Sequence, residues 1–288
     1  MIETLLRRFF SLFGKKIPRR TFDPYRHQFA YPSRRLKRIV TVTVYLPPSY
    51  FSAPHAPFPL LLFNDGQDLE AVGLAPTLQR LYKQGRLREL VVAGLHAGEQ
   101  RLQEYGTAGR PDYQYRGQLA GAHTRFVLRE LLPFLHRNYR LTAECAYAGF
   151  SLGGLSAFDI VWNHPDRFRL AGVFSGAFWW RSLPFHPQDP DAGRIAHTMV
   201  ATGRPRPGLR FWFQTGTQDE TADRNQNGVI DSIDDTLDLI AELERQGFRR
   251  GRDIRYLEIE GGEHRPATWA TALPDFLEWG FSPVSAEE

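Results

Sequence analysis

A serine flanked by glycines lies in the run Gly149-Phe150-Ser151-Leu152-Gly153-Gly154. A short apolar run precedes it, and the apolar residues that follow have helical spacing. Strand, tight turn and helix in this order match the G-x-S-x-G pattern of a nucleophile elbow. Such a turn exposes the hydroxyl of Ser151 and directs the N–H of Leu152 at a developing oxyanion. The alternative is an ordinary Gly-rich turn, and the flanking strand and helix favour the nucleophile.

A serine nucleophile needs a base, and the base needs an acid that orients it. Asp219 and His264 follow two later predicted strands, so the chain order is Ser, Asp, His, as in proteins with this elbow. Glu220 is the alternative acid, but Asp219 is nearer to its strand end. Two glycines before His264 permit a tight turn there. The sequence therefore predicts a triad of Ser151, Asp219 and His264.

Two further stretches are candidates for the rest of the site. The loop 64–67 follows an early predicted strand, and the N–H of Gln67 is the predicted second oxyanion donor. A simple Asp-Gly turn is the alternative interpretation of this loop. The aromatic residues Phe178, Trp179 and Trp180 lie just beyond another strand end. They are predicted to line a substrate pocket, or alternatively to pack a lid against the core.

Residues 223–234 match the twelve-residue calcium loop, with oxygen ligands at alternate positions, a central glycine and a terminal acid. The predicted ligands are Asp223, Asn225, Asn227, Val229, Asp231 and Asp234. The predicted Ca²⁺ ion is structural and holds the segment that follows Asp219, and no cofactor is expected for catalysis. The alternative is an Asn-Gly surface turn with a helix cap at Asp234.

The elements that must position these residues alternate between strands and helices. Predicted strands cover residues 39–46, 60–63, 90–95, 145–148, 170–174, 211–213 and 254–259. Predicted helices cover residues 75–83, 123–139, 155–162, 236–246 and 268–279. This alternation predicts an α/β fold with a mostly parallel sheet and helices on both faces. We expect one domain, 35–288, with a lid-like insertion at about 178–208.

Residues 1–34 are predicted to form a basic N-terminal arm that begins with an amphipathic helix. The chain of 288 residues carries a net charge of +4, and much of the surplus lies in this arm. A solvated extension is favoured over contact with nucleic acid or an anionic membrane surface. No nucleic-acid-binding motif accompanies the arm, so no nucleic acid partner is expected.

Composition and the length of the apolar runs indicate a globular domain without a disulfide or a transmembrane helix. Hydrophobic residues make up 42% of the chain, as is typical of a globular domain. Cys145 is the one cysteine, so no internal disulfide forms. No apolar run reaches the roughly 18 residues of a transmembrane helix, and no signal peptide is recognised, so a cytoplasmic location is expected. The oligomeric state is left open.

Several motifs together resemble a known family. They are the elbow, Asp65-Gly66-Gln67, Arg101 with Glu104-Tyr105, Glu130-Leu131-Leu132-Pro133 ending in Asn138-Tyr139-Arg140, Pro165-Asp166-Arg167-Phe168, Ser175-Gly176, Gly216-Thr217-Gln218-Asp219 and Gly262-Glu263-His264. Over roughly residues 35 to 280 the chain resembles the putative esterase family, which is similar to enterochelin esterases, esterase D and the feruloyl esterase domains of xylanases.

The resemblance implies an α/β-hydrolase fold and a serine esterase that cleaves small-molecule carboxylic esters through an acyl-enzyme, like the enterochelin esterases. It places Ser151, Asp219 and His264 in the triad, and Leu152 and Gln67 in the oxyanion hole. The elbow reads Phe-Ser-Leu instead of the His-Ser-Met of the formylglutathione-hydrolysing branch, which disfavours that substrate. An acyltransferase with the same machinery and a non-catalytic binding protein are the alternatives.

Overall fold

The computed structural model describes residues 25–283 and contains an eight-stranded sheet with the order β1-β2-β4-β3-β5-β6-β7-β8. The strands are β1 (Arg26–Ser33), β2 (Arg38–Tyr45), β3 (Phe58–Asn64), β4 (Val91–Leu95), β5 (Leu141–Phe150), β6 (Leu170–Phe174), β7 (Arg210–Gln218) and β8 (Ile254–Glu263). β2 pairs antiparallel with β1 and β4, and all other pairs are parallel. The carboxyl ends of β3 to β8 therefore share one edge of the sheet.

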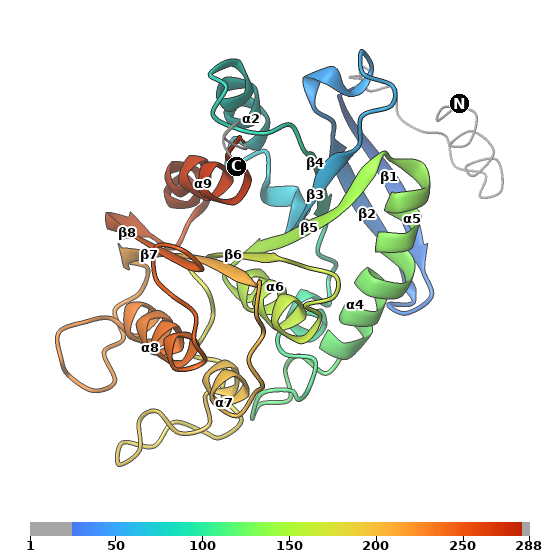
Figure 1. Ribbon diagram of the computed structural model, residues 1–288. Coiled ribbons are helices and arrows are strands. Elements are labelled where there is room, and N and C mark those ends of the chain that lie inside the picture. The colour runs from blue at the N-terminus through green and yellow to red at the C-terminus, as the bar shows by residue number, and fades with distance from the viewer. Residues whose placement is uncertain (1–24, 284–288) are drawn as a thin grey trace.

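Helices cover both faces of this sheet (Figure 1). They are η1 (Pro48–Tyr50), η2 (Gly66–Asp68), α2 (Leu74–Lys83), α3 (Arg101–Glu104), α4 (Ala120–Phe126), η3 (Val127–Leu131), α5 (Leu132–Asn138), α6 (Leu152–Asn163), α7 (Ile195–Ala201), α8 (Asp231–Arg245) and α9 (Pro266–Phe281). One apolar core lies beneath α2 and α9, and the other lies beneath α4 to α6 and α8. This arrangement confirms the predicted α/β class.

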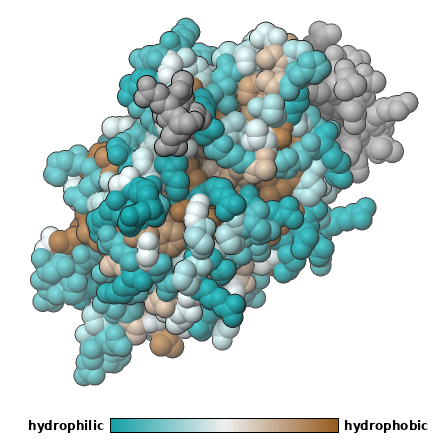
Figure 2. All heavy atoms as spheres, viewed as in Figure 1, coloured by the Kyte–Doolittle hydropathy of each residue, from teal (hydrophilic) through white to brown (hydrophobic). Residues whose placement is uncertain are grey.

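The strands at the centre of the sheet are apolar along their whole length because helices cover them on both sides. Every residue of β3, β4 and β6 is buried. The outer surface seen in Figure 2 is mostly hydrophilic, with small apolar patches between polar residues. None of the described helices is both long and apolar enough to cross a bilayer.

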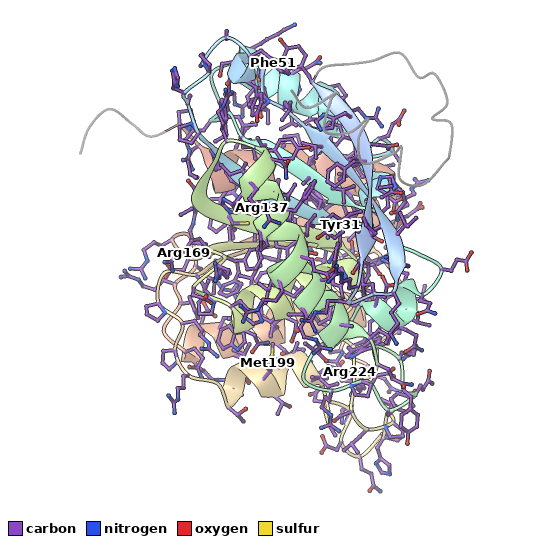
Figure 3. The ribbon with its side chains drawn as sticks, turned by 90° about the vertical axis from the view of Figure 1, so that its right-hand side faces the viewer. Tyr31, Phe51, Arg137, Arg169, Met199 and Arg224 are labelled. Carbon is purple, nitrogen blue, oxygen red and sulfur yellow. The ribbon has the colours of Figure 1, made fainter. Side chains whose placement is uncertain are left out.

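The predicted arm overlaps an edge strand. Residues 26–33, assigned above to the arm, form β1 and pair with the full length of β2. Phe29 is buried, and Tyr31 packs against Phe126 and Phe134, with ring centroids 5.8 and 5.3 Å away (Figure 3). The strand was not predicted because half of its residues are polar and because it contains Pro32, a residue that is unusual in strands but tolerated at the edge of a sheet. Residues 1–24 of the arm, including its predicted helix, lie outside the described residues.

The insertion at 178–208 is attached to the domain at its start and through α7. Its first residues are buried in the core, and α7 packs against α8. Its longest run of exposed residues is 183–189. The α4–η3–α5 segment is one continuous helix whose π-helical turn, Val127–Leu131, comes just before Pro133.

Candidate active site

Ser151 lies at the turn between β5 and α6 and has φ 54° and ψ −121°, a conformation that costs a non-glycine residue energy. Its N–H donates to the carbonyl of Phe174 at 2.8 Å, which fixes the turn against β6. A Cβ atom at Gly149 would lie 2.4 Å from the carbonyl oxygen of Gly153, so the turn can form only with glycine there. Leu152 begins α6, and its N–H has no partner among the described residues. The elbow is therefore strained, and it ends in a free N–H group.

The ends of β7 and β8 approach closely and bring Asp219 and His264 together. A Cβ atom at Gly216 would lie 2.2 Å from the carbonyl oxygen of Gly262, so glycine at this position permits the approach. Each of the two polar residues directly follows its strand. Nδ1 of His264 lies 3.8 Å from Oδ1 of Asp219, which is longer than a hydrogen bond. Catalytic contacts of this kind are often long before substrate binds.

Asp219 is buried and held by two donors. The N–H of Gly216 donates to Oδ2 at 2.9 Å, and the hydroxyl of Ser175 donates to Oδ1 at 3.0 Å. The indole N–H of Trp269 donates to the same Ser175 hydroxyl at 3.0 Å, which orients it. Burial raises the pKa of Asp219, while these hydrogen bonds and His264 oppose the rise. The carboxylate is thus fixed in position beside the imidazole.

His264 is held near the elbow by Trp269. The Trp269 ring meets the His264 ring edge-on, with centroids 5.4 Å apart, and stacks on Phe150 at 4.7 Å. Burial lowers the pKa of His264, Asp219 partly restores it, and the Arg101 guanidinium lowers it further. The net lowering of its pKa favours the neutral imidazole, which is the form that a general base requires.

The alternative acid, Glu220, faces a different part of the molecule. Burial and the carboxylates of Asp231 and Asp235 in α8 raise the pKa of Glu220 to about 7. The charges that shift the pKa of Glu220 are those of α8 and of Asp219, whereas His264 is the charged neighbour that shifts the pKa of Asp219. This geometry favours Asp219 as the acid of the proposed triad.

The loop after β3 packs directly against the start of α6. Asp65 has φ 57° and is buried, and the guanidinium of Arg101 binds both of its oxygens at 2.7 and 2.8 Å. A Cβ atom at Gly153 would lie 2.5 Å from Oδ2 of Asp65, so the loop and the elbow touch. The side chain of Gln67 accepts a hydrogen bond from the N–H of Ala97 at 3.0 Å. The N–H of Gln67 itself has no partner among the described residues.

The three aromatic candidates differ in exposure. Phe178 and Trp180 are fully buried, so for them the packing alternative describes the structure. Trp179 is 39% exposed, and the guanidinium of Arg116 lies over its ring at 5.0 Å from the centroid. Of the three, only Trp179 presents surface to a substrate.

The predicted calcium loop gathers some of its candidate ligands. The amide groups of Asn225 and Asn227 both donate to Oδ2 of Asp234 at 2.9 Å. The N–H groups of Asn227 and Gly228 donate to the two oxygens of Asp223 at 3.1 and 2.9 Å. The side chains of Asp223, Asn225, Asn227 and Asp234 therefore belong to one loop. Rotation of the two Asn amide groups by half a turn would direct their oxygens, in place of their nitrogens, toward a cation.

One of the predicted ligands, Asp231, has a cationic partner in the structure. The N–H and the guanidinium of Arg224 bind its Oδ1 at 2.9 and 3.1 Å. Between residues 25 and 283 no three His, Cys, Asp or Glu side chains converge as a metal site. Calcium binding by the six predicted ligands, the carbonyl of Val229 included, stays a prediction.

The local sequence patterns did not identify three residues that support the site. Ser175 and Trp269 support the acid, and Arg101 clamps the loop that carries Gln67. Ser175 has a positive φ of 46° at the end of β6, and a polar residue at a strand end was the available signal. Arg101 contributed to the resemblance, but no local pattern shows that its partner is Asp65.

Residues 33–279 match the family model described as "Putative esterase". A ferulic acid esterase superposes with a TM-score of 0.66 at 17% identity, covering 89% of this chain and 97% of that chain. The enterobactin esterase FES from Shigella flexneri, in the presence of 2,3-di-hydroxy-N-benzoyl-serine, gives 0.69 at 20% identity, covering 91% of this chain and 60% of that one. The siderophore hydrolase EstB from Aspergillus nidulans gives 0.63 at 16% identity, covering 92% and 98%. These structures show that the fold is shared.

Proposed function

Because the chain belongs to the putative esterase family and is a carboxylic ester hydrolase, we propose that it works through an acyl-enzyme formed on Ser151. The observation that carries the proposal is the strained elbow at Ser151, with the Asp219–His264 contact at the ends of nearby strands. Strain of this kind is retained where the surrounding fold enforces it, and it often marks a functional site.

In the proposed acylation step, the Ser151 oxygen attacks the ester carbonyl carbon. Nε2 of His264 takes the hydroxyl proton, because Nδ1 faces Asp219. The carboxylate of Asp219 stabilises the imidazolium that forms. The free N–H groups of Leu152 and Gln67 donate to the oxyanion, and each such donor contributes about 10²–10³ in kcat.

Collapse of the tetrahedral intermediate breaks the carbonyl–alkoxy bond, and His264 returns its proton to the leaving alkoxide. In the deacylation step, His264 deprotonates a water molecule that attacks the acyl-enzyme carbonyl. The acid product leaves, and the proton returns to Ser151. Atoms and charge balance over the cycle with water as the only co-substrate.

For the substrate, we propose an ester with an aromatic group, as in the enterochelin and feruloyl esters. The supporting feature is Trp179, whose exposed ring lies beneath the Arg116 guanidinium. Arg116 is itself fixed by an ion pair with buried Asp112. A flat aryl ring can stack on such a platform, and aromatic pairs contribute about 0.5–1.5 kcal/mol beyond their buried area.

The proposal is tested by hydrolysis of 4-nitrophenyl butyrate. Ser151→Ala should lose several orders of magnitude in kcat/KM and remain folded, whereas the exposed-serine control Ser52→Ala should retain the parent rate. The parent rate should not depend on added alcohol, which separates a hydrolase from an acyltransferase. Retained activity in Ser151→Ala would disprove the proposed nucleophile.

A further inference from the structure

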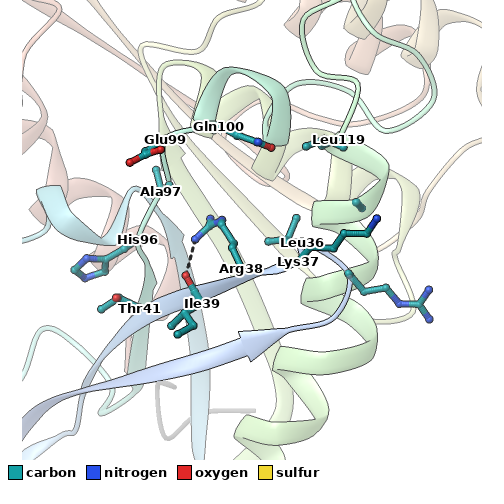
Figure 4. Close-up of a pocket in the computed structure, with 13 residues that line it drawn as sticks. Leu36, Lys37, Arg38, Ile39, Thr41, His96, Ala97, Glu99, Gln100 and Leu119 are labelled. Carbon is teal, nitrogen blue, oxygen red and sulfur yellow. Dashed lines mark hydrogen bonds between the residues drawn. The ribbon is translucent and has the colours of Figure 1, made fainter. Parts of the chain in front are cut away.

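A pocket with a volume of about 650 Å³ lies at the same sheet edge as Ser151. The start of β2, the segment after β4 and the start of α4 surround it (Figure 4). The order β5-β3-β4-β2 places it two to three strands from Ser151, or about 10–14 Å at the usual strand spacing. Its volume falls in the range of small-molecule sites, about 300–1,000 Å³.

Basic side chains dominate the charge of this pocket. Arg35, Lys37 and Arg38 line it, and Glu99 is the one acid among its lining residues. Arg38 is already bound by Glu104, with two contacts of 2.6 Å. Arg35 and Lys37 are exposed and form no ion pair with any described residue. Two cations are therefore available to an anionic ligand.

The turn that carries these cations is ordered by hydrogen bonds. The hydroxyl of Ser33 accepts the N–H of Leu36 at 3.0 Å and donates to Glu130 of η3 at 2.7 Å. Leu36 is buried, and Lys37 has a positive φ of 53°, so the turn has a defined shape. Cations presented by a fixed turn lose less freedom on binding than cations on a flexible segment.

The rest of the lining includes an apolar surface. It is formed by Leu36, Ile39, Leu119 and Ala122, and Ile39 is 61% exposed. An exposed β-branched side chain that lines the same pocket as two cations without ion pairs suits a ligand with an apolar body and an anionic end. A carboxylate fits this chemistry because guanidinium and ammonium groups form charge-assisted hydrogen bonds with it.

The wall of the pocket contacts the loop 64–67, which carries the proposed oxyanion donor Gln67. The N–H of Ala97, a lining residue, donates to the side chain of Gln67. The carbonyl of Gly98, another lining residue, accepts the N–H of Arg101 at 3.0 Å, and Arg101 clamps Asp65. A group bound in the pocket is thus one hydrogen bond away from the loop that is proposed to bind the oxyanion.

From this geometry we infer that the pocket binds the carboxylate of an amphiphilic molecule. The inference relies on the proposed function, because one source of this carboxylate is the far end of the ester that Ser151 cleaves. The other source is a separate carboxylic acid that acts through the Gln67 loop. The chemistry is the same in both cases, and the two sources can be separated by kinetics.

The test uses mono-4-nitrophenyl esters of diacids from succinic to dodecanedioic acid, each compared with the ester whose far carboxylate is a carboxamide. In the parent, kcat/KM for the acid should exceed that for the amide by about tenfold at the longer lengths and by little at the shortest. Lys37→Glu and Arg35→Glu should abolish this preference. Arg34→Glu is the matched control, because Arg34 is exposed on the same turn but does not line the pocket. It should retain most of the preference.

A second arm adds decanoate to assays of 4-nitrophenyl acetate. In one outcome, decanoate changes the rate saturably in the parent but not in Lys37→Glu, while the esters show no length-dependent preference. That result identifies a separate carboxylic acid, and not the substrate, as the source of the bound carboxylate. The inference is overturned if the parent shows neither the carboxylate preference nor the saturable effect of decanoate. It is also overturned if Lys37→Glu and Arg34→Glu respond equally. Loss of acetate hydrolysis in the parent would refute the proposed function instead, so the two failures are distinguishable.

Discussion

Arg101→Gln should damage stability and catalysis together, because Arg101 neutralises a buried carboxylate beside the elbow. The Asp65 side chain is 1% exposed and the Arg101 side chain is 36% exposed. Removing one partner of a fully buried pair costs about 3–5 kcal/mol. Since water reaches part of Arg101, we expect about 2–3 kcal/mol loss in the free energy of unfolding. The remaining side-chain donor to Asp65 is Gln67 at 3.3 Å, which is too weak to compensate.

The double variant Asp65→Asn/Arg101→Gln should recover part of this loss, because no charge then remains buried. A double-mutant cycle in urea, with unfolding followed by fluorescence, measures this coupling. Arg86→Gln is the control: the side chains of the Arg86–Glu278 pair are 53% and 25% exposed, so water screens the pair and its loss should cost less than about 1 kcal/mol.

Arg101→Gln should also change kcat and the pH dependence of kcat/KM in a defined direction. A displaced Gln67 loop should lower kcat by about tenfold to hundredfold, less than or equal to the loss of a whole oxyanion donor. Neutral His264 is the active form, so kcat/KM falls as pH drops through the pKa of His264. Arg101 lowers that pKa, so Arg101→Gln should move the acid limb to higher pH, whereas Arg86→Gln should not move it. The positioning role of Arg101 would be refuted if the acid limb of the kcat/KM profile did not move in Arg101→Gln. It would also be refuted if the double variant were as unstable as Arg101→Gln.

Three further outcomes follow from the site. Asp219→Asn should lose about 10⁴ in kcat, whereas Glu220→Gln should lose little, and equal losses would contradict the assignment of the acid. Burial raises the pKa of Glu220 from 4.5 to about 7, so its neutral form stabilises the fold at low pH and this stability is lost as pH rises through about 7. In thermal unfolding between about pH 5 and about pH 8, Glu220→Gln should therefore show a smaller decline than the parent. Ca²⁺ at about a hundred times its Kd should stabilise EDTA-treated protein by about 2.7 kcal/mol and Asp223→Ala by less; no shift in the parent, or an equal shift in both, would exclude the calcium site.

The fold class could be predicted because apolar runs and helical spacing are local properties of the chain. The run at β3, for example, is buried throughout, as its sequence indicates. The position of Ser151 follows equally from local pattern, since Gly149 is required by its contact with Gly153, four residues along the chain. β1 was missed because its strand character depends on pairing with β2 and on packing against α4 and α5.

The supports of the site depend on contacts between distant segments, which no local pattern contains. Arg101 and Asp65 are far apart in sequence, and so are Ser175 and Trp269. The calcium loop shows the same limit: Arg224 binds Oδ1 of the predicted ligand Asp231, and the spacing of the loop does not indicate this contact. In each case the choice among polar partners is made by tertiary packing.

Covalent labelling tests the central claim most directly. A fluorophosphonate probe should react with the parent protein, and peptide mapping by mass spectrometry should place the adduct on Ser151. Labelling should be strongly slowed in His264→Ala, because the base that activates the hydroxyl is then missing. An adduct on another residue, or a parent protein that does not react, would contradict the account.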